Sequence, residues 1–287
     1  IPYSPVSVIL QCTYFYNYSR MSVPITNCSD PMGPVYTGRY GPENTAAKET
    51  IAVVSYNIKF AEKITEAIDD LSGMSELRDA DILLLQEMDH EGTESIASAL
   101  RYNYVYYPAS IHKTGKDFGN AILSRWPIHS HRKIMLPHER WDNKQRRIAV
   151  AGMIDMAGTD MIAYSVHTET IAISIWESRK KRVSQVDAIV KSMPEAEVVE
   201  QVIVGGDFNS WTEGGSIKAM ESLFATKGLE RATKGIGATA TSLHLLFLTF
   251  DHIFTRGMTV LDRGKVKQAK ASDHKPIWVK LKINGSI

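Results

Sequence analysis

The stretch Val202-Ile203-Val204-Gly205-Gly206-Asp207-Phe208-Asn209 is an apolar run that closes on two glycines and an acid. A short apolar run bounded by turn residues is typical of a buried β-strand, and neighbouring glycines indicate a tight turn. We therefore predict a strand over 202–207, with Asp207 and Asn209 placed where that strand ends.

The same arrangement recurs along the chain, because polar residues repeatedly stand at the ends of expected strands. The further strands of this kind cover residues 51–56, 81–87, 161–166, 250–254 and 276–281. The polar residues at or beside their ends are Asn57, Glu87, His167, Asp251, Asp273 and His274. Strands that end together on one edge of a sheet would gather these side chains into one cleft. Carboxylate and carboxamide oxygens suit a hard cation such as Mg²⁺ or Mn²⁺, and histidines beside such a cation suit phosphoryl chemistry.

Each of these residues alone has a simpler interpretation. An acid after a strand is more often a turn or cap residue, and a lone histidine is more often structural. Glu87 is different, because an acid that closes the apolar run Leu83-Leu84-Leu85 needs a partner. The whole set, in order along the chain, is therefore the signal.

The balance of expected elements indicates the fold class. Additional strands are expected over 102–107, 119–124 and 147–154, and helices over 61–77, 94–101 and 178–192. Many strands with few helices favour two packed sheets with helices outside, rather than a doubly wound parallel sheet.

The composition and net charge limit both the class of protein and the partners that it can bind. The 287 residues are 44% hydrophobic and 23% charged, which excludes a disordered, collagen-like or coiled-coil protein. Lys and Arg total 33 against 32 Asp and Glu, so a polyanion-binding surface has to be a local patch. No apolar run approaches the roughly 20 residues that span a bilayer. We expect a monomer without stable membrane insertion.

The first 48 residues differ from the rest, since they hold six of the eleven prolines. We predict that residues 1–48 form an extended arm packed on a catalytic domain at 49–287. Cys12 and Cys28 both lie in this arm. They either form one disulfide or remain unpaired, and the first alternative would place the protein in an oxidising compartment. We expect an exported protein, secreted or periplasmic, rather than a cytoplasmic one.

Six motifs together resemble the endonuclease/exonuclease/phosphatase superfamily, the group of deoxyribonuclease I. They are Ser55-Tyr56-Asn57, Leu84-Leu85-Gln86-Glu87, Gly119-Asn120-Ala121-Ile122-Leu123-Ser124, Gly206-Asp207-Phe208-Asn209, Phe250-Asp251-His252-Ile253 and Ser272-Asp273-His274. The resemblance covers about residues 50–283. It implies a deoxyribonuclease I-like α/β fold, a four-layer αββα sandwich of two mixed β-sheets.

The resemblance also implies a role for each matching residue. Glu87 is expected to be the principal metal ligand, with Asn57 beside it. Asp207 is expected to orient or deprotonate the attacking water, and Asn209 to hold the phosphate. His274 would bind or protonate a phosphate oxygen.

Five further residues complete this implied site. Asp251 is expected to fix the tautomer of His274, and Asp273 to serve a second metal position or its water shell. His167 matches the histidine of the nuclease and sphingomyelinase branches. Asn120 is expected to contact substrate, and Arg147 either reaches the phosphate or forms a surface ion pair. The implied cofactor is Mg²⁺, with Mn²⁺ as the alternative, and the implied reaction is in-line attack of water on a phosphodiester.

The substrate is the least determined part. We rank a nuclease acting on DNA or RNA first, with a groove built from Arg140, Lys144, Arg146, Arg147 and the basic run 179–182. A lipid or small-molecule phosphodiesterase or phosphatase is the alternative, with 171–176 as a candidate membrane-facing loop. A binding scaffold without chemistry is the third hypothesis.

Overall fold

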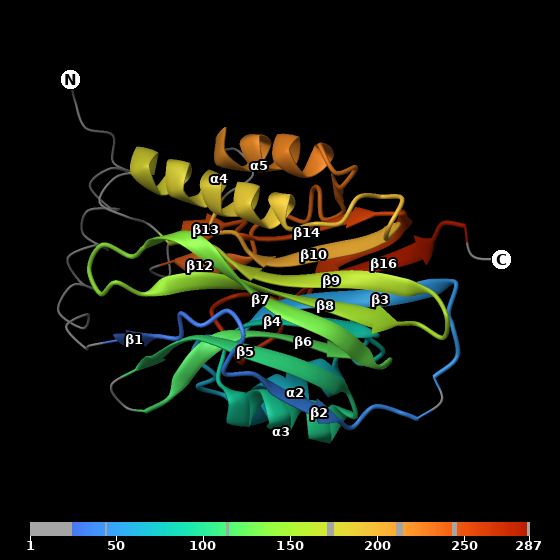
Figure 1. Ribbon diagram of the computed structural model, residues 1–287. Helices are drawn as coiled ribbons and strands as arrows, with labels where there is room; N and C mark the ends of the chain where they lie inside the picture. Colours follow the sequence, from blue (N-terminus) through green and yellow to red (C-terminus); the bar gives the residue numbers. More distant parts are fainter. Residues whose placement is uncertain are drawn as a thin grey trace.

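The computed structural model describes residues 25–43, 45–112, 115–170, 175–210, 215–242 and 246–285. Two β-sheets are stacked face to face, and a pair of helices covers the outer face of each sheet (Figure 1). The order of layers is helix, sheet, sheet, helix. This arrangement confirms the predicted four-layer αββα sandwich.

The first sheet has the strand order β1-β5-β6-β4-β3-β16-β15, and β2 also pairs with β5. Its strands are β1 (Ile25–Asn27), β2 (Tyr36–Arg39), β3 (Thr50–Asn57), β4 (Ile82–Met88), β5 (Asn103–His112), β6 (Asp117–Ser124), β15 (Met258–Lys265) and β16 (Ile277–Ile283). Among the described strands of this sheet, only β3 and β4 are parallel neighbours, so their polar carboxyl ends lie at the same edge.

The second sheet has the order β11-β14-β10-β9-β8-β7. Its strands are β7 (Ile128–Glu139), β8 (Arg146–Asp155), β9 (Asp160–His167), β10 (Gln201–Asp207), β11 (Glu230–Arg231) and β14 (Asp251–Arg256). Here β9 and β10 are the parallel pair. A separate two-stranded sheet consists of β12 (Ala240–Ser242) and β13 (Leu246–Leu248).

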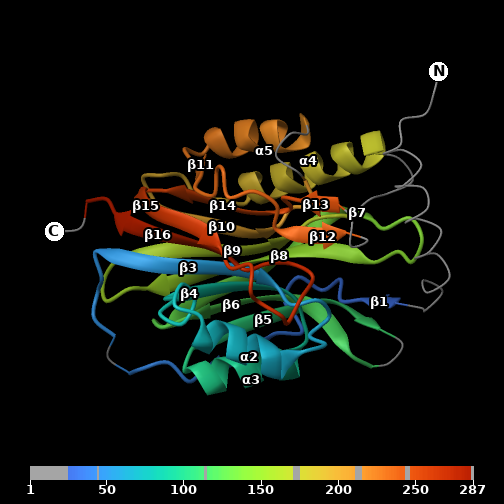
Figure 2. The same ribbon diagram turned by 180° about the vertical axis from the view of Figure 1, so that it is seen from behind.

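Four helices complete the described part of the chain. They are α2 (Ile64–Gly73), α3 (His90–Leu100), α4 (Ile175–Lys191) and α5 (Gly215–Ala225). The first two pack on the outer face of the first sheet and the last two on the second, as both views show (Figure 1, Figure 2). Among the described residues, no helix is both long and apolar enough to cross a membrane.

Three apolar clusters hold the layers together. One fills the space between the sheets and includes Val53, Ile122 and Ile203, all fully buried. The other two lie between each sheet and its helices, around Leu71 and around Val186. Because strands in the middle of a sandwich are covered on both faces, they read as unbroken apolar runs, which is why the sequence locates them well.

Part of the N-terminal segment belongs to the first sheet. β1 and β2 both pair with β5 at its edge. Lys133 of β7 donates from Nζ to the carbonyls of Cys28 and Gly33, at 2.7 Å each, so the segment also contacts the second sheet. Cys28 is buried, whereas Cys12 lies outside the described residues. The disulfide and the boundary at residue 48 therefore stay predictions.

Candidate active site

Strand register brings the polar strand ends of both sheets together. In the second sheet, Asp207 at the end of β10 is the register partner of His167 in β9 and of Asp251 in β14. In the first sheet, Asn57 ends β3 beside the parallel strand β4, which carries Glu87. Asn57 Nδ2 donates to Asp207 Oδ2 at 3.1 Å, so the two sheets meet at this point.

A β-bulge directs the side chain of Glu87. The pairing of β4 with β6 shifts between Gln86 and Met88, so Glu87 is the extra residue, and its φ is +58°. Opposite the bulge, a Cβ on Gly119 would lie 2.0 Å from the Tyr107 carbonyl oxygen, so only glycine fits there. Bulges re-aim side chains beside active sites, and this one turns the carboxylate toward the other sheet.

The amide of Asn57 links the buried carboxylate of Asp207 to that of Glu87, whose side chain is 14% exposed. Its Nδ2 donates to Glu87 Oε1 at 3.2 Å as well as to Asp207. The second oxygen of Glu87 accepts from the backbone N–H of Phe60 at 3.2 Å, and Asp207 Oδ1 accepts from the backbone N–H of Asn209 at 2.9 Å. Burial raises the pKa of both carboxyl groups, because the interior disfavours their charged forms.

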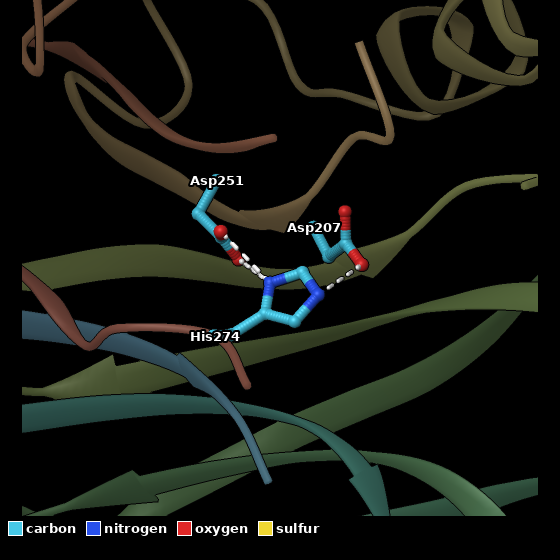
Figure 3. A group of neighbouring side chains, drawn as sticks. All are labelled: Asp207, Asp251 and His274. Atoms are coloured by element: carbon cyan, nitrogen blue, oxygen red, sulfur yellow. Dashed lines mark hydrogen bonds and ion pairs between the residues drawn. The ribbon is translucent and has the colours of Figure 1, made fainter. Parts of the chain in front are cut away.

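His274 lies between two aspartates, as Figure 3 shows. Its Nδ1 donates to Asp251 Oδ2 at 2.9 Å, and its Nε2 lies 3.8 Å from Asp207 Oδ2. The Thr239 hydroxyl donates to Asp251 Oδ2 at 2.6 Å and accepts from the backbone N–H of Phe250 and Asp251. Burial alone would lower the pKa of His274, but the carboxylates of Asp251 and Asp207 raise it above its ordinary value.

His167 faces the two carboxylates from the other side. Its Nε2 lies 3.6 Å from Asp207 Oδ2 and 3.8 Å from Glu87 Oε1. Its Nδ1 is 3.3 Å from Arg147 Nη1. Burial, reinforced by the charge of Arg147, lowers the pKa of His167 well below its ordinary value. Arg147 is only 3% exposed, so it does not form the surface ion pair that the sequence allowed.

Two other expected site residues have different surroundings. Asn120 is buried, and its Nδ2 donates to the carbonyls of Ile148 at 3.0 Å and Ser165 at 3.2 Å. It therefore connects the first sheet to the second, and its amide donors are committed to backbone. The side chain of Asp273 is 48% exposed at the rim, with Lys59 Nζ 3.7 Å from its carboxylate.

Sequence reasoning missed Thr239, which reaches Asp251 across the loop that contains the β12–β13 hairpin. No local pattern marks this threonine, because its contact depends on how that loop folds back. The backbone N–H of Phe60 was also missed, because the sequence does not show which main-chain donors will face a functional side chain.

The basic residues expected to form a nucleic-acid groove are mostly committed to other contacts. The ion pairs are Arg140–Asp142 at 2.9 Å, Arg146–Glu139 at 3.1 Å and Lys181–Glu177 at 3.1 Å. Arg182, part of the basic run 179–182 expected in that groove, is only 2% exposed. These contacts leave less positive charge free for a phosphate backbone than the sequence indicated.

The donor set fits a divalent cation. Glu87 and Asp207 place carboxylates in a buried site, and within the described ranges no lysine or arginine forms an ion pair with either. The ligand atoms of Asp207, Asp251 and His274 also lie within 4.8 Å of one another. Burying carboxylates is unfavourable unless nearby positive charge or a proton compensates them, and these oxygen donors suit a hard metal.

The chain is similar to known proteins over most of its length. The chain has a phosphoesterase fold, and residues 54–274 match the Endonuclease/Exonuclease/phosphatase family. The match spans most of the chain, so the protein belongs to that family, whose members are hydrolases acting on phosphoester bonds. The resemblance inferred from the six motifs is thereby confirmed.

The curated relatives match a shorter part of the chain. A UPF0294 protein of Vibrio campbellii is 28% identical over 127 residues, which are 44% of this chain and 42% of the relative. One of Vibrio parahaemolyticus is 34% identical over 83 residues, 29% of this chain and 28% of the relative. The aligned part thus spans less than half the length of these relatives.

Solved structures share the fold at low sequence identity. An endonuclease/exonuclease/phosphatase from Beutenbergia cavernae superposes with a TM-score of 0.66 at 18% identity, covering 83% of this chain and 72% of that one. TDP2 of D. rerio complexed with a single-strand DNA product gives 0.63 at 16%, covering 82% and 99%. A mannosyl-6-phosphatase of Bacteroides thetaiotaomicron gives 0.60 at 22%, covering 80% and 99%.

Proposed function

We propose that this protein is a divalent-metal-dependent phosphodiester hydrolase, and that it acts as a nuclease on DNA or RNA. The observation that carries the proposal is the convergence of Glu87, Asn57 and Asp207 with two histidines at one sheet edge. These groups supply oxygen ligands, a site for the attacking water and proton donors, which together are what hydrolysis of a phosphoester requires.

Glu87 is the metal ligand in this proposal, with Asn57 and Asp273 beside it. Mg²⁺ or Mn²⁺, when bound, would offset the negative charge that develops on the phosphoryl oxygens. We assign the metal to Glu87 rather than to the Asp207, Asp251 and His274 group, because His274 Nδ1 and Asp251 already bond to each other.

Asp207 orients the attacking water and accepts its proton. Its two oxygens are fixed by the Asn57 amide and the Asn209 backbone N–H, so the carboxylate keeps a single orientation. A base held in one geometry spares the reaction the entropy of positioning it. Asn209, just beyond it, holds the phosphate.

His274 supplies a proton donor toward the phosphate. Because a carboxylate only accepts hydrogen bonds, the Nδ1–H of His274 must point to Asp251. Protonated at Nε2 as well, the ring offers its second N–H on the side of Asp207, where substrate oxygens would lie. Asp251 is the residue that positions the ring.

A second candidate is hydrolysis of a small phosphate ester, and the ion-paired surface favours it. Most of the cations expected in a nucleic-acid groove are paired or buried. The fold does not discriminate between the two candidate functions, because TDP2 in complex with its DNA product and the mannosyl-6-phosphatase both share it. The two candidates differ in substrate size but use the same reacting groups.

A substrate panel tests the proposal. Plasmid DNA, RNA, sphingomyelin, inositol phosphates and mannose 6-phosphate would each be incubated with Mg²⁺, Mn²⁺ or EDTA. We expect EDTA-sensitive cleavage of a nucleic acid. Cleavage confined to a monoester or a lipid would replace the nuclease by the corresponding alternative, and no EDTA-sensitive cleavage at all would favour a binding scaffold.

Paired variants separate site chemistry from folding. Glu87→Gln and Asp251→Asn should each lower kcat by about 100-fold or more. Glu66→Gln and Asp69→Asn make the same chemical changes at exposed positions of α2 and should leave kcat unchanged. Equal activity of all four variants would refute the site assignment.

A further inference from the structure

Phe60 places an exposed aromatic ring beside the proposed metal ligand. Its backbone N–H donates to Glu87 Oε2 at 3.2 Å, which fixes the residue next to the carboxylate. Phe60 is nevertheless 48% exposed, whereas the neighbouring Phe118 is 3% exposed. Phe60 is therefore not packed into the core, and part of it is open to solvent beside the carboxylate.

The ring is supported by other aromatic side chains. The Phe60 ring centroid lies 5.2 Å from that of Phe118 and 5.9 Å from that of His112, which meets it edge-on at 86°. Phe118 in turn lies 5.9 Å from the ring of His167. The row of rings therefore runs from the reacting groups to the surface, and Phe60 stands at its outer end.

The backbone that carries Phe60 is held in an unusual conformation. Lys59, Phe60 and Ala61 have φ values of +45°, +56° and +51°, and none of them is glycine. Left-handed backbone is unfavourable for residues with a Cβ, and such outliers concentrate at functional sites. The Glu87 carboxylate on Phe60 and the Asn57 side chain on the N–H of Lys59 hold this turn in place.

We propose that Phe60, supported by His112 and Phe118, is a subsite that stacks a flat aromatic ring belonging to the alcohol or phenol that is esterified to the phosphate at Glu87. This rests on the proposed phosphodiesterase function and names the chemistry of the substrate's flank. The aromatic group can be a nucleobase or the ring of a phenolic leaving group. Base–aromatic stacking is tolerant of sequence because every base has a π-face, so the subsite selects for a ring and not for one base.

The test compares three phosphodiesters that differ only in what flanks the phosphate. They are the dinucleotide d(TpT), the same dimer with abasic tetrahydrofuran units, and p-nitrophenyl methyl phosphate. Phe60→Ala should raise KM by at least about fivefold for a substrate with a ring, the lower end of the effect of removing one stack. The abasic dimer should change by less than about twofold.

Further variants distinguish the loss of the aromatic ring from an effect of misfolding. Phe60→Trp should keep or lower KM for the ring-bearing substrates, and Phe60→Leu should behave like Phe60→Ala. Leu261→Ala, at a 52% exposed position on β15, is the control and should change nothing. As an independent readout, thymidine 5′-monophosphate should bind Phe60→Ala more weakly than wild type, whereas deoxyribose 5-phosphate should bind both equally.

The outcomes distinguish the two proposals. An effect confined to d(TpT) identifies a nucleobase, and one confined to the nitrophenyl ester identifies a phenolic leaving group. Equal effects of Phe60→Ala on all three substrates, or no effect on any, would overturn the subsite. If the wild-type protein cleaves none of the three while remaining folded, the phosphodiesterase function itself fails.

Discussion

Arg147 donates from Nη1 to Nδ1 of His167 at 3.3 Å, and this contact fixes the tautomer of the histidine. A guanidinium can only donate hydrogen bonds, so Nδ1 must carry the lone pair and the proton of the neutral ring must be on Nε2. That N–H faces Asp207 and Glu87, and Nε2 has no hydrogen-bond partner among the described residues. His167 therefore presents an N–H to the cleft, and we expect it to act as a hydrogen-bond donor rather than as a metal ligand.

Replacing Arg147 should release this constraint. In Arg147→Leu, His167 would populate both tautomers, and kcat should fall by about tenfold, the lower range for losing a group that orients a site residue. Arg147→Gln retains an N–H donor and should keep the Nε2–H form. ¹⁵N chemical shifts of the imidazole measure the tautomer directly. An unchanged ring spectrum in the leucine variant would contradict the assignment.

The left-handed backbone of Glu87 predicts a difference in stability between two inactive variants. At φ +58°, a glutamate is strained by about 1 kcal/mol, whereas asparagine adopts this region readily. Both Glu87→Asn and Glu87→Gln remove the buried charge, and they differ in their tolerance of this backbone conformation as well as in side-chain length. In urea unfolding with EDTA, the asparagine variant should be more stable than the glutamine variant by about 1 kcal/mol. Both should be inactive, and equal stabilities would exclude strain at this bulge.

Thr239 should affect kcat although it is not one of the proposed reacting residues. Its hydroxyl accepts from two backbone N–H groups and must therefore direct its own proton to Asp251. Thr239→Val would leave those groups without a partner, which costs about 1–3 kcal/mol of unfolding free energy. It should also lower kcat by about tenfold, because Asp251 would hold His274 less firmly. Thr239→Ser is the control, and a serine variant as impaired as the valine variant would argue against the hydroxyl.

The sequence predicted the fold well where strands are covered on both faces. Runs such as 202–206 and 82–85 contain no polar side chain, and their polar ends follow directly. It did not predict β7 or β15, because edge strands face solvent and lack an unbroken apolar run. Helix α5 was also missed, since it begins at a glycine next to residues rich in turn formers.

The sequence predicted which residues form the candidate site, but not the contacts between them or their burial. Polar strand ends named Asp207 and Glu87, but their contact through the Asn57 amide depends on how two sheets stack. The burial of Arg147 could not be inferred, because a basic residue heading a strand is usually exposed. Tertiary packing, and not local pattern, decides whether such a residue reaches solvent or orients a histidine.

Stability should depend on pH through a histidine outside the reacting set. His252 is fully buried, its Nε2–H donates to the Ser210 carbonyl at 2.8 Å, and its Nδ1 has no partner among the described residues. Burial, with a smaller effect of Arg231, lowers its pKa from 6.5 to about 4. As the pH falls from 6.5 toward 4, the unfolded chain therefore binds this proton and the native protein does not.

The expected loss is about 3 kcal/mol of unfolding free energy across that range, because each unit of pKa difference corresponds to about 1.4 kcal/mol. The buried carboxyl groups of Asp207 and Glu87 act in the opposite direction, since their raised pKa values make the native state bind protons first. His252→Gln, which keeps an N–H for Ser210, removes only the histidine contribution. The difference in urea stability between wild type and this variant should therefore shift in favour of the variant as the pH falls, and parallel pH profiles would show that His252 is protonated equally in both states.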